Sequence, residues 1–600
     1  MFFGLRPPAA PPAAEPEIDV LVVGAGPAGL TAALTLASYG LRVHALTQFP
    51  WLANSPRAHI TNQRTMEVLR DLGVDDEVMT YGSPWDQMGD TLFTTSLAGP
   101  EIARIRAWGS GDDEHGRYVR SSPSEMVDVP QPYLESVLVR NAGERGARVR
   151  FNTEYLGHTQ HSGGVDVRVR ETLSGTESVV RAKYLVGADG ARSAVARDIN
   201  LEFEGDMGRG STVYVRFEAD LTHLVAHRPS ILYWIVSDGG AYGEIGLGLL
   251  RAVRQWGEWI AGWGFDPADG EADLSTETVT RRIREFIGDP DIDVEVLGTS
   301  VWQVNEAYAT TFGKGRVFCA GDAVHRHPPS GGLGSNTSVQ DSANLAWKLA
   351  YVLKGWAGPE LLETYEAERV PVGRHVVGRA NQSRRDYVEL HAALGQVPGS
   401  AKDSVLRRVS DPSDEGVRAR DALGQALAVK QYEFNALGVE HNQRYSSAAV
   451  ISDGNDDEQW SEDPELYATP TTRPGAKLPH TWLVGPDGRR VSTLDVVGAG
   501  CFTLVTGCSG TDWPEVVGEL DLPYLRCVVV DGPEVADLYR SWQEARQIDE
   551  AGALLVRPDG YIAWRHAVSP DDRDAARHAL TAALEHVLSL SIRTSEGVAP

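Results

Sequence analysis

The stretch that most constrains the fold of this chain is residues 19–47, DVLVVGAGPAGLTAALTLASYGLRVHALT. Val20 to Val23 form a short apolar run that is rich in β-branched residues, which predicts a buried strand. A glycine-rich turn follows, then an apolar helix-forming segment from Leu30 to Tyr39, and Leu41 to Leu46 predicts a second strand. Strand, turn, helix and strand in this order predict a βαβ unit of an α/β fold.

The turn of this unit has the sequence of a nucleotide-binding motif. Its glycines permit a tight turn, close approach of a pyrophosphate and close packing of the helix on the strand, and the N–H groups of the helix start would face the phosphates. The second strand ends at Thr47 and Gln48, where such folds usually carry an acidic residue for a ribose. Either side chain can bind a ribose hydroxyl, less strongly than a carboxylate does. The motif residues are Gly24, Ala25, Gly26, Pro27, Ala28 and Gly29.

Two other interpretations of this stretch remain as alternatives. Val20 to Leu41 carries no charge, which a membrane helix would also show, but the three glycines and the proline of GAGPAG argue against a membrane span. A glycine-rich turn without any ligand is the second alternative, and the strand and helix on either side argue against it.

Composition excludes several classes of function. A length of 600 residues suggests about three domains. The formal net charge of −27 argues against nucleic acid or an anionic membrane as a partner. The four cysteines form no CxxC pair and no disulfide framework. Residues 1–16 are rich in Pro and Ala and lack the features of a signal peptide, so we expect a disordered leader and a cytoplasmic protein.

Two further predicted strands end at an aspartate. The run from Tyr184 to Val186 leads into GADG, which contains Asp189, and the run from Val317 to Ala320 leads into Gly321 and Asp322. Ligands of open α/β sheets bind at the carboxyl ends of the strands, so both aspartates are candidate cofactor contacts.

The second aspartate is followed by a loop rich in proline and glycine, which opens a long helix near Ser335 and Asn336. The N-terminus of that helix would offer positive potential to a developing anion. His325 and His327 in the loop have no Asp, Glu or Cys at ligand spacing, so we predict no metal site.

Other segments give a coarser prediction. We expect residues 74–130 to be irregular, 130–146 to form an amphipathic helix, and 358–391 to be helical. Residues 211–248 read as strands of an antiparallel sheet. Tryptophans at 256, 259 and 263 have helical spacing, which predicts a helix over 251–263 that contributes to the core.

The C-terminal part reads as a smaller α/β unit. Its predicted strands are 502–505, 526–530 and 553–556, and its predicted helices are 533–543 and 571–588. An acidic, turn-rich stretch at 452–464 marks a boundary before it.

Four motifs now stand in order along the chain: GAGPAG at 24–29, GADG at 187–190, GDAVHRHPPSGGLGSN at 321–336 and YEAERVP at 365–371. Together they resemble the single-component, FAD-dependent aromatic hydroxylases, the group A flavoprotein monooxygenases. PRAHITNQRTMEVLRDLG at 56–73 resembles the phenol hydroxylase branch of that family. The resemblance implies an α/β fold, in which a Rossmann-type FAD-binding domain is interleaved with an antiparallel-sheet substrate domain and followed by a C-terminal thioredoxin-like domain.

The resemblance also implies a division into domains. The leader would be 1–16, the FAD-binding domain 17–205 and 296–395, and the substrate domain 206–295. A helical segment and acidic linker would occupy 396–465, and the thioredoxin-like domain 466–600. Because redox cysteines are missing from that last domain, we expect it to have a structural or interface role.

Residue roles implied by the resemblance concern the cofactor first. The GAGPAG glycines would hold the FAD pyrophosphate, and Asp322 would bind the ribityl chain. Asp189 is associated with both FAD and NAD(P)H in the family. The remaining implied FAD contacts are Thr47, Gln48, Arg57, Gln131, Gly321, Pro329, Gly332, Leu333, Gly334, Ser335 and Asn336.

Two residues are implied as catalytic. His59 matches the position of an active-site carboxylate in related phenol hydroxylases, and a histidine with a pKa near neutrality suits deprotonation of a phenol. Tyr233 lies with Tyr214 and Trp234 in strand-like sequence that would form an aromatic substrate pocket.

The implied reaction is the hydroxylation of a phenolic ring, ortho to its oxygen. NADPH or NADH would bind transiently and reduce FAD, O2 would form the flavin C4a-hydroperoxide, and this would transfer its oxygen to the phenolate. The resemblance suggests a homodimer acting on a small aromatic phenol. The alternatives are a hydroxylase of the same group that tailors a larger aromatic such as a polyketide, and a flavin-binding sensor without turnover.

Overall fold

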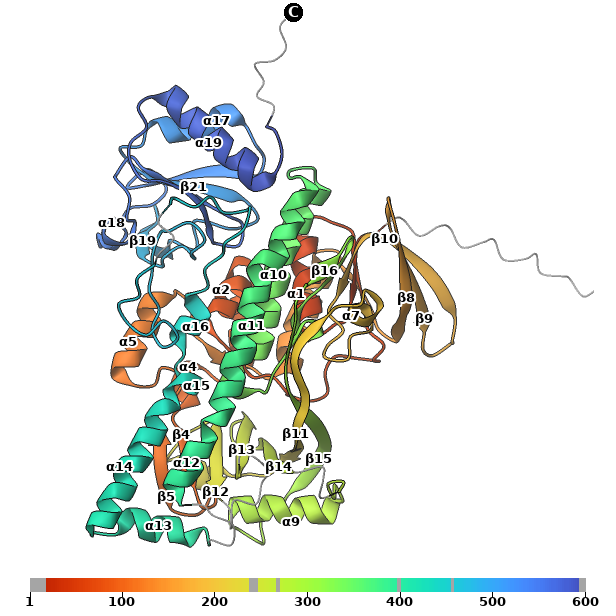
Figure 1. The fold of residues 1–600 in the computed structure, drawn as a ribbon, viewed down its shortest axis with the longest axis vertical. Helices are drawn as coiled ribbons and strands as arrows, with labels where there is room; N and C mark the ends of the chain where they lie inside the picture. Colours follow the sequence, from red (N-terminus) through yellow and green to blue (C-terminus); the bar gives the residue numbers. More distant parts are fainter. Residues whose placement is uncertain (1–17, 237–245, 266–269, 396–400, 455–457, 593–600) are drawn as a thin grey trace, which may run out of the picture.

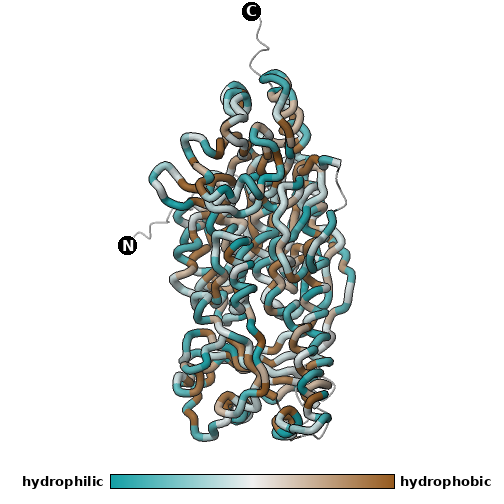
Figure 2. The backbone as a smooth tube through the Cα atoms, turned by 90° about the vertical axis from the view of Figure 1, so that its left-hand side faces the viewer, coloured by the Kyte–Doolittle hydropathy of each residue, from teal (hydrophilic) through white to brown (hydrophobic). Residues whose placement is uncertain are grey.

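The computed structural model describes residues 18–236, 246–265, 270–395, 401–454 and 458–592. The molecule is elongated in both views, with the C-terminal domain at one end and the sheet that contains β12 at the other (Figures 1 and 2). The predicted leader, residues 1–16, lies outside the described residues. Every helix within the described ranges is too short or too polar to cross a bilayer.

The first sheet contains the predicted βαβ unit. Its central strand β1 (Ile18–Val23) is buried along its whole length, and it is parallel to β2 (Val43–Leu46) and to β10 (Glu177–Gly187). Helix α1 (Pro27–Ser38) joins β1 to β2. The strand order is β16-β17-β10-β1-β2-β7, and β17 is parallel to β10. The Rossmann-type prediction is confirmed. The other strands are β7 (Arg148–Arg150), β8 (Thr153–His161), β9 (Gly164–Glu171), β16 (Gly313–Lys314) and β17 (Val317–Cys319).

The second sheet is largely antiparallel, as predicted, and has the order β18-β15-β11-β14-β13-β12-β4-β5. Alternate residues of its strands point to opposite faces. One face, which includes Val213, Val215 and Phe217, forms a core with α9 (Thr276–Ile287). The strands are β4 (Thr91–Thr94), β5 (Glu101–Ile105), β11 (Phe203–Glu218), β12 (Leu232–Val236), β13 (Leu247–Arg254), β14 (Glu258–Phe265), β15 (Glu295–Ala309) and β18 (His325–Arg326).

The predicted helix over 251–263 is wrong. These residues belong to β13 and β14, which pair as a hairpin, and Trp256 lies in the turn between them. A spacing of four residues puts side chains on one face of a strand as well as on one face of a helix, so the tryptophan pattern did not distinguish the two. Trp259 and Trp263 are buried in the core, as predicted.

Residues 74–130 are not irregular, contrary to the prediction. They contribute β4 and β5 to the second sheet, where β4 pairs with β12. They also form α3 (Asp75–Tyr81), α4 (Trp85–Met88), α5 (Asp112–Ser121) and β6 (Val127–Asp128). The strands among these elements are short and lack strong periodicity, so pairing with strands distant in the sequence fixes β4 and β6.

Two long helices pack against each other, one beside the helices of the first sheet and one beside the second sheet. Helix α10 (Leu333–Leu353) packs against α1 and α2 (Gln63–Asp71), and α11 (Glu363–Arg385) packs against α10 and β15. The predicted helical region 358–391 is thus confirmed. The remaining helices of this part are α6 (Gln131–Glu144), α7 (Ala194–Asp198), α8 (Thr222–Val225), α12 (Tyr387–Leu394), α13 (Asp403–Ser410), α14 (Asp414–Val429), α15 (Gln431–Phe434) and α16 (Leu437–His441).

The C-terminal domain has a thioredoxin-like sheet of order β22-β21-β23-β24. Strand β21 (Phe502–Gly507) is parallel to β22 (Leu525–Val530) and antiparallel to β23 (Ala553–Val556), which pairs with β24 (Ile562–His566). The predicted strands and the helix α19 (Arg573–Leu588) are confirmed, whereas α17 (Asp512–Leu520) was not predicted. Two further strands, β19 (Trp482–Val484) and β20 (Arg490–Ser492), form a small hairpin.

The predicted helix over 533–543 is wrong for most of its length. Only α18 (Ser541–Ala545) forms there, because Val535 and Ala536 instead make β-bridges to Val530 and Val484. The predicted domain boundaries stay predictions. Strands β11 and β15 run without interruption across two of them, 205/206 and 295/296.

Gly24 offers a test of the contact between β1 and β10. Its φ is +113°, and a Cβ there would lie 2.0 Å from the carbonyl oxygen of Ala188. We expect Gly24→Ala to destabilise the protein by about 1–3 kcal/mol, which a melting curve would show as a lower melting temperature. Gly143→Ala is the matched control, because nothing lies within 4 Å of a Cβ at that helical position. Equal melting temperatures for the two variants would contradict this account.

Candidate functional site

The carboxyl ends of four parallel strands lie along one edge of the first sheet. β1 leads into the GAGPAG turn, β2 into Thr47, β10 into Asp189, and β17 into Gly321 and Asp322. The parallel pairing therefore brings together segments that are far apart in the chain. This edge is the one at which open α/β sheets bind their ligands.

The GAGPAG turn has room for a phosphate only on its outer side. A Cβ at Gly29 would lie 2.0 Å from the carbonyl oxygen of Gly24, whereas a Cβ at Gly26 would meet nothing closer than the Glu135 carboxylate at 3.9 Å. Gly26 is the N-cap of α1, and no side chain caps that helix. The N–H groups of the first turn are therefore open to an anion, and the turn fits a pyrophosphate. The motif is completed by Ala25, Pro27 at the first helical position, and Ala28.

The predicted adenosine side lies at the end of β2. Thr47 is buried, and its hydroxyl accepts a hydrogen bond from the Phe49 N–H at 3.4 Å, while Gln48 is exposed. Arg57 is exposed in the segment that leads to His59. The structure thus places Thr47, Gln48 and Arg57 near the carboxyl edge of the first sheet, and no hydrogen bond among the described residues joins any two of them.

Gln131 begins α6 and points to Glu135, a residue that sequence reasoning missed. Its amide donates to Glu135 Oε1 at 2.7 Å, and the Ala53 N–H donates to Glu135 Oε2 at 2.7 Å. Burial raises the pKa of Glu135. This carboxylate therefore fixes the loop after β2 beside Gly26, and a lone acidic residue in an apolar helix face is the signal that could have identified it.

Asp189 orders its own loop. Its Oδ1 accepts from Ser193 Oγ at 2.5 Å, and its Oδ2 accepts from the Ala194 N–H at 2.7 Å and the Val195 N–H at 3.3 Å. The side chain thus binds the start of α7, beside the sheet edge. Its predicted contact with a cofactor stays a prediction.

The loop after β17 has a backbone shape that fits a flat ring. Gly321, Gly331 and Gly332 have φ between +65° and +75°, and Gly332 ends the loop as the N-cap of α10, where no side chain caps the helix. Asp322 is exposed, and its carboxylate accepts no hydrogen bond from the described residues that surround it. The neighbouring predicted contacts are Pro329, which is exposed, Leu333, which is buried, and Gly334 and Ser335, which are half-buried.

Asn336 joins this loop to the segment that carries His59. Its amide donates to the carbonyl oxygen of Ile60 at 2.8 Å, and its Oδ1 accepts from the Asn62 N–H at 3.0 Å. Asn336 is buried. The two segments predicted to flank the flavin are therefore fixed to each other.

His59 lies in a buried cluster of charges. Strand β3 (Ile60–Thr61) pairs with β6, which places Asp128 Oδ1 3.7 Å from His59 Nδ1. Arg251 of β13 donates to the same oxygen at 2.5 Å. His59 is 4% exposed, and neither ring nitrogen has a hydrogen-bond partner among the described residues. Because Nδ1 faces Asp128 and buried polar atoms are usually paired, Nε2 is the ring nitrogen that is open to a ligand.

Burial and charge set the protonation of this cluster. Burial lowers the pKa of His59, and the Arg251 guanidinium lowers it further, against a smaller opposite effect of Asp128. Although burial raises the pKa of Asp128, Arg251 and His59 hold it below its usual value. His59 is therefore a neutral imidazole beside an ionised carboxylate at neutral pH.

Sequence reasoning missed Asp128 and Arg251. Each is a charged residue inside an apolar, strand-like run, MVDVP and LGLLRAV, and that pattern is the signal that could have identified them.

Tyr233 does not lie beside His59, and its prediction as catalytic needs correction. Its ring packs on Trp259 in the core with α9, and its hydroxyl donates to the carbonyl oxygen of Arg228 at 3.2 Å. In the register of β12 with β13, Tyr233 is opposite Leu250, on the face away from Arg251. Neighbouring strand residues point to opposite faces, and the sequence did not show which one faces the site.

Tyr214 takes the place of Tyr233 at the site-facing side of the sheet. It is half-buried, its ring lies 5.7 Å from that of Trp302, and partial removal from water raises its pKa to about 12, against an opposite effect of Arg251. Trp234 is on this face as well and packs on Tyr387. Tyr214 and Trp234 thus share the face of the sheet that carries Arg251, and their place in a substrate pocket stays a prediction.

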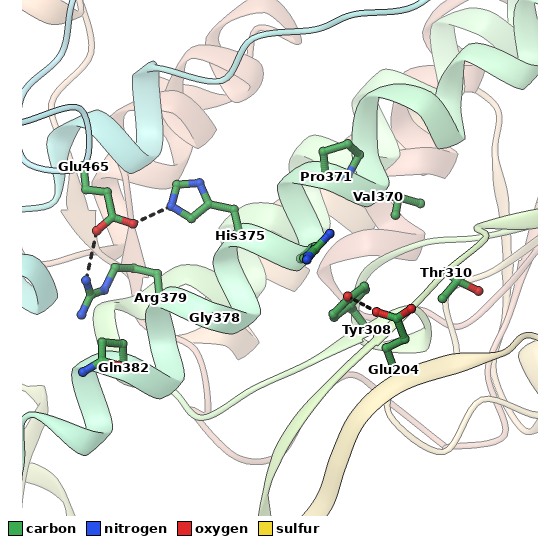
Figure 3. Close-up of a pocket in the computed structure, with 11 residues that line it drawn as sticks. Glu204, Tyr308, Thr310, Val370, Pro371, His375, Gly378, Arg379, Gln382 and Glu465 are labelled. Atoms are coloured by element: carbon green, nitrogen blue, oxygen red, sulfur yellow. Dashed lines mark hydrogen bonds and ion pairs between the residues drawn. The ribbon is translucent and has the colours of Figure 1, made fainter. Parts of the chain in front are cut away.

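A separate surface pocket of about 720 Å³ lies between α11, β11, β15 and Glu465 (Figure 3). Glu465 accepts from His375 at 2.7 Å and from Arg379 at 3.0 Å, and Tyr308 donates to Glu204. The pocket includes none of the predicted site residues. Because its charged groups largely pair with one another, we assign it no ligand.

Comparison with known proteins agrees with this geometry. Residues 17–380 match the FAD binding domain family, and residues 471–589 match the family of the aromatic-ring hydroxylase C-terminal domain. The chain is 46% identical over 564 residues to 2,4-dichlorophenol 6-monooxygenase of Cupriavidus pinatubonensis. The aligned region covers 93% of this chain and 94% of that protein. It is 45% identical over 558 residues to phenol 2-monooxygenase of a Pseudomonas strain, with coverages of 92% and 90%.

A solved structure is also similar to this chain over nearly its whole length. The flavin-dependent monooxygenase PieE, in complex with FAD and substrate, superposes with a TM-score of 0.91 at 40% identity over 96% of this chain and 100% of that one. The protein is therefore an enzyme, with FAD as cofactor and with NAD(P)H and O2 as co-substrates, which excludes a flavin sensor without turnover. This chain belongs to the family of FAD-dependent aromatic-ring hydroxylases.

Proposed function

We propose that this enzyme hydroxylates a small phenol ortho to its hydroxyl group and releases a catechol. The observation that carries this proposal is the buried His59, whose Nδ1 faces the Asp128–Arg251 ion pair and whose Nε2 has no hydrogen-bond partner among the described residues. The names of the two similar enzymes, which act on phenol and on 2,4-dichlorophenol, support the same substrate class.

His59 acts as the base that removes the phenol proton. Asp128 faces Nδ1, so Nδ1 carries the hydrogen and Nε2 accepts the proton of the substrate. The imidazolium that forms is stabilised by the Asp128 carboxylate. Arg251 stabilises the phenolate, and the phenolate is a much stronger nucleophile at its ortho carbon than the phenol.

The cofactor would lie along the sheet edge. The start of α1 would hold the pyrophosphate, Asp322 would bind the ribityl chain, and Gly332 to Asn336 would face the isoalloxazine. When bound, FAD supplies the redox chemistry that activates O2 with electrons from NAD(P)H. The burial of His59 and Asp128 keeps water from this part of the site, which favours oxygen transfer over loss of peroxide.

Finer assignments accompany this proposal. We propose a homodimer, which the family resemblance supports. We propose the cytoplasm as the location, which the four unpaired cysteines support. The division into FAD-binding, substrate and thioredoxin-like domains at the boundaries given above is also a proposal.

Asp322 tests the cofactor placement. We expect Asp322→Ala to weaken FAD binding roughly tenfold to a hundredfold, because a charged hydrogen bond contributes about 1.5–3 kcal/mol. Fluorescence titration of the apoprotein with FAD measures this. Asp421→Ala, at an exposed position of α14, is the control. Wild-type affinity in Asp322→Ala would remove this residue from the cofactor site.

His59 tests the chemistry. We expect His59→Gln to lower kcat at least about a hundredfold and to raise the fraction of O2 released as peroxide, because a positioned base contributes roughly 10²- to 10⁴-fold. Catechol and peroxide are assayed in the same reaction. His578→Gln, at an exposed position of α19, should behave as wild type. Normal coupling in His59→Gln would exclude it as the base.

The acid side of the pH profile tests the cluster. Activity should fall as the pH drops through the lowered pKa of His59, because the protonated ring accepts no proton. Asp128→Asn removes an effect that raises this pKa, so the acid limb should move to lower pH. Arg251→Met removes an effect that lowers it, so the limb should move to higher pH. Profiles of kcat/KM that move in the same direction for both variants would contradict this assignment.

A substrate panel tests the proposal as a whole. NADPH and NADH oxidation under air is followed with phenol, 2,4-dichlorophenol, a hydroxybenzoate and a polycyclic phenol. Stimulated oxidation with formation of catechol from a simple phenol supports the proposal. Product from the polycyclic phenol alone would instead identify a tailoring hydroxylase of the same group.

A further inference from the structure

A loop of the thioredoxin-like domain inserts charged side chains into the FAD-binding part of the molecule. The loop joins β23 to β24 and contains Arg557 and Asp559. Arg557 is fully buried and donates twice to Glu368 of α11, at 2.6 and 2.8 Å. Asp559 accepts from the Trp347 indole of α10 at 3.1 Å. Helices α10 and α11 are thus both held by this one loop.

The charges at this contact are fully matched. Glu368 also accepts from Lys348 at 2.8 Å, from Asn344 at 2.8 Å and from Ser447 at 2.7 Å. Glu368 and Lys348 are both buried. Removing one partner of such a group leaves an uncompensated buried charge, so the arrangement has little freedom to shift.

The next residue of α11 extends the contact toward the cofactor loop. Arg369 donates to Asp341 of α10 at 2.8 Å and to the Tyr445 hydroxyl at 3.0 Å. The ring of Tyr445 stacks on that of Tyr561, which belongs to the thioredoxin-like domain, with centroids 4.1 Å apart. Tyr561 of the thioredoxin-like domain therefore holds Arg369 in place through Tyr445.

Asp341 ends this chain of contacts at the loop after β17. Its Oδ2 accepts from the Gly321 N–H at 3.1 Å and binds His325 Nε2 at 2.7 Å. Asp341 and His325 are both completely buried. The backbone next to Asp322 is thus set by an ion pair that the thioredoxin-like domain holds in place.

A second set of contacts reaches the segment that carries His59. Lys477 of the thioredoxin-like domain donates to Glu67 at 2.6 Å, and Arg64 donates to Glu67 at 3.0 Å and to the carbonyl oxygen of Asp559 at 2.9 Å. Arg64 lies in the first turn of α2, two residues after Asn62, the residue that binds Asn336. Both segments predicted to flank the flavin are thus anchored in the same domain.

We propose that the thioredoxin-like domain positions the flavin site, with Arg557 as the main positioning residue. This inference rests on the proposed placement of FAD beside residues 321–336. The domain acts through Glu368, Arg369 and Asp341 on the loop, and it carries out no chemistry of its own. This coupling is reciprocal. The free energy by which the domain favours the binding of FAD equals the free energy by which bound FAD stabilises the contacts of the domain.

Hydrogen exchange of the full-length protein with and without FAD tests this coupling. We expect FAD to protect the amides of 321–336 and also those of the β23–β24 hairpin. The hairpin should gain more protection than α19, which lies in the same domain and reports the general stabilisation by a ligand. In Arg557→Met we expect the extra protection of the hairpin to vanish and the dissociation constant of FAD to rise about tenfold.

Controls separate positioning from stability. Arg573→Met removes an exposed arginine of the same domain, whose partners Glu515 and Glu519 lie within that domain, and it should leave FAD binding unchanged. Arg557→Lys keeps the charge and should restore part of the affinity. The visible spectrum of bound flavin and the ratio of peroxide to catechol should change in Arg557→Met well below its melting temperature.

Two results would overturn the inference. If FAD protects 321–336 in the wild type but protects the hairpin no more than α19, the domain does not position the flavin. This comparison needs no variant and holds even if Arg557→Met fails to fold. If FAD does not protect 321–336 at all, the proposed placement of the cofactor is wrong, and the inference fails with it.

Discussion

The parallel pairing of β1, β2, β10 and β17 is the constraint on which the rest of the structure depends. It brings distant strand ends to one edge, where a turn, two aspartates and a helix start can converge on one ligand. The pairing is tight at the glycine turn, since Gly24 lies against the backbone of Ala188 without room for a side chain. The second sheet joins that edge through β18, which follows Asp322 and pairs with β15, and the C-terminal domain contacts helices α2, α10 and α11.

Buried charge is the second feature that organises the molecule. Asp128 with Arg251, Asp341 with Arg369, and Glu368 with Arg557 are ion pairs removed from water. Such pairs add little net stability but tolerate few alternative arrangements, because each unpaired charge would be costly. His59 faces one of these pairs, and neither of its ring nitrogens has a hydrogen bond among the described residues. Fixed charges beside a histidine that can still accept a proton are what a rigid site around a reactive base requires.

Much of the fold and part of the site could be predicted from local sequence. Strong hydrophobic periodicity and glycine or proline turns mark several elements that the structure confirms. These are the βαβ unit, the GADG and GD strand ends, the long helices and the strands of the last domain. The tryptophan stripe misled, because a spacing of four suits a strand as well as a helix. Residues 74–130 misled because β4 and β6 form by pairing with strands distant in the sequence, β12 and β3.

The sequence by itself therefore determined the nucleotide-binding edge, because glycine turns and strand ends are encoded by neighbouring residues. It also singled out His59. Only the tertiary structure decided which groups surround that histidine, since Asp128 and Arg251 come from different strands and meet through sheet pairing. It likewise decided between Tyr214 and Tyr233, because the face that a strand presents depends on what it packs against. Contacts such as Arg557 with Glu368 join residues far apart in the chain, and no local pattern encodes their meeting.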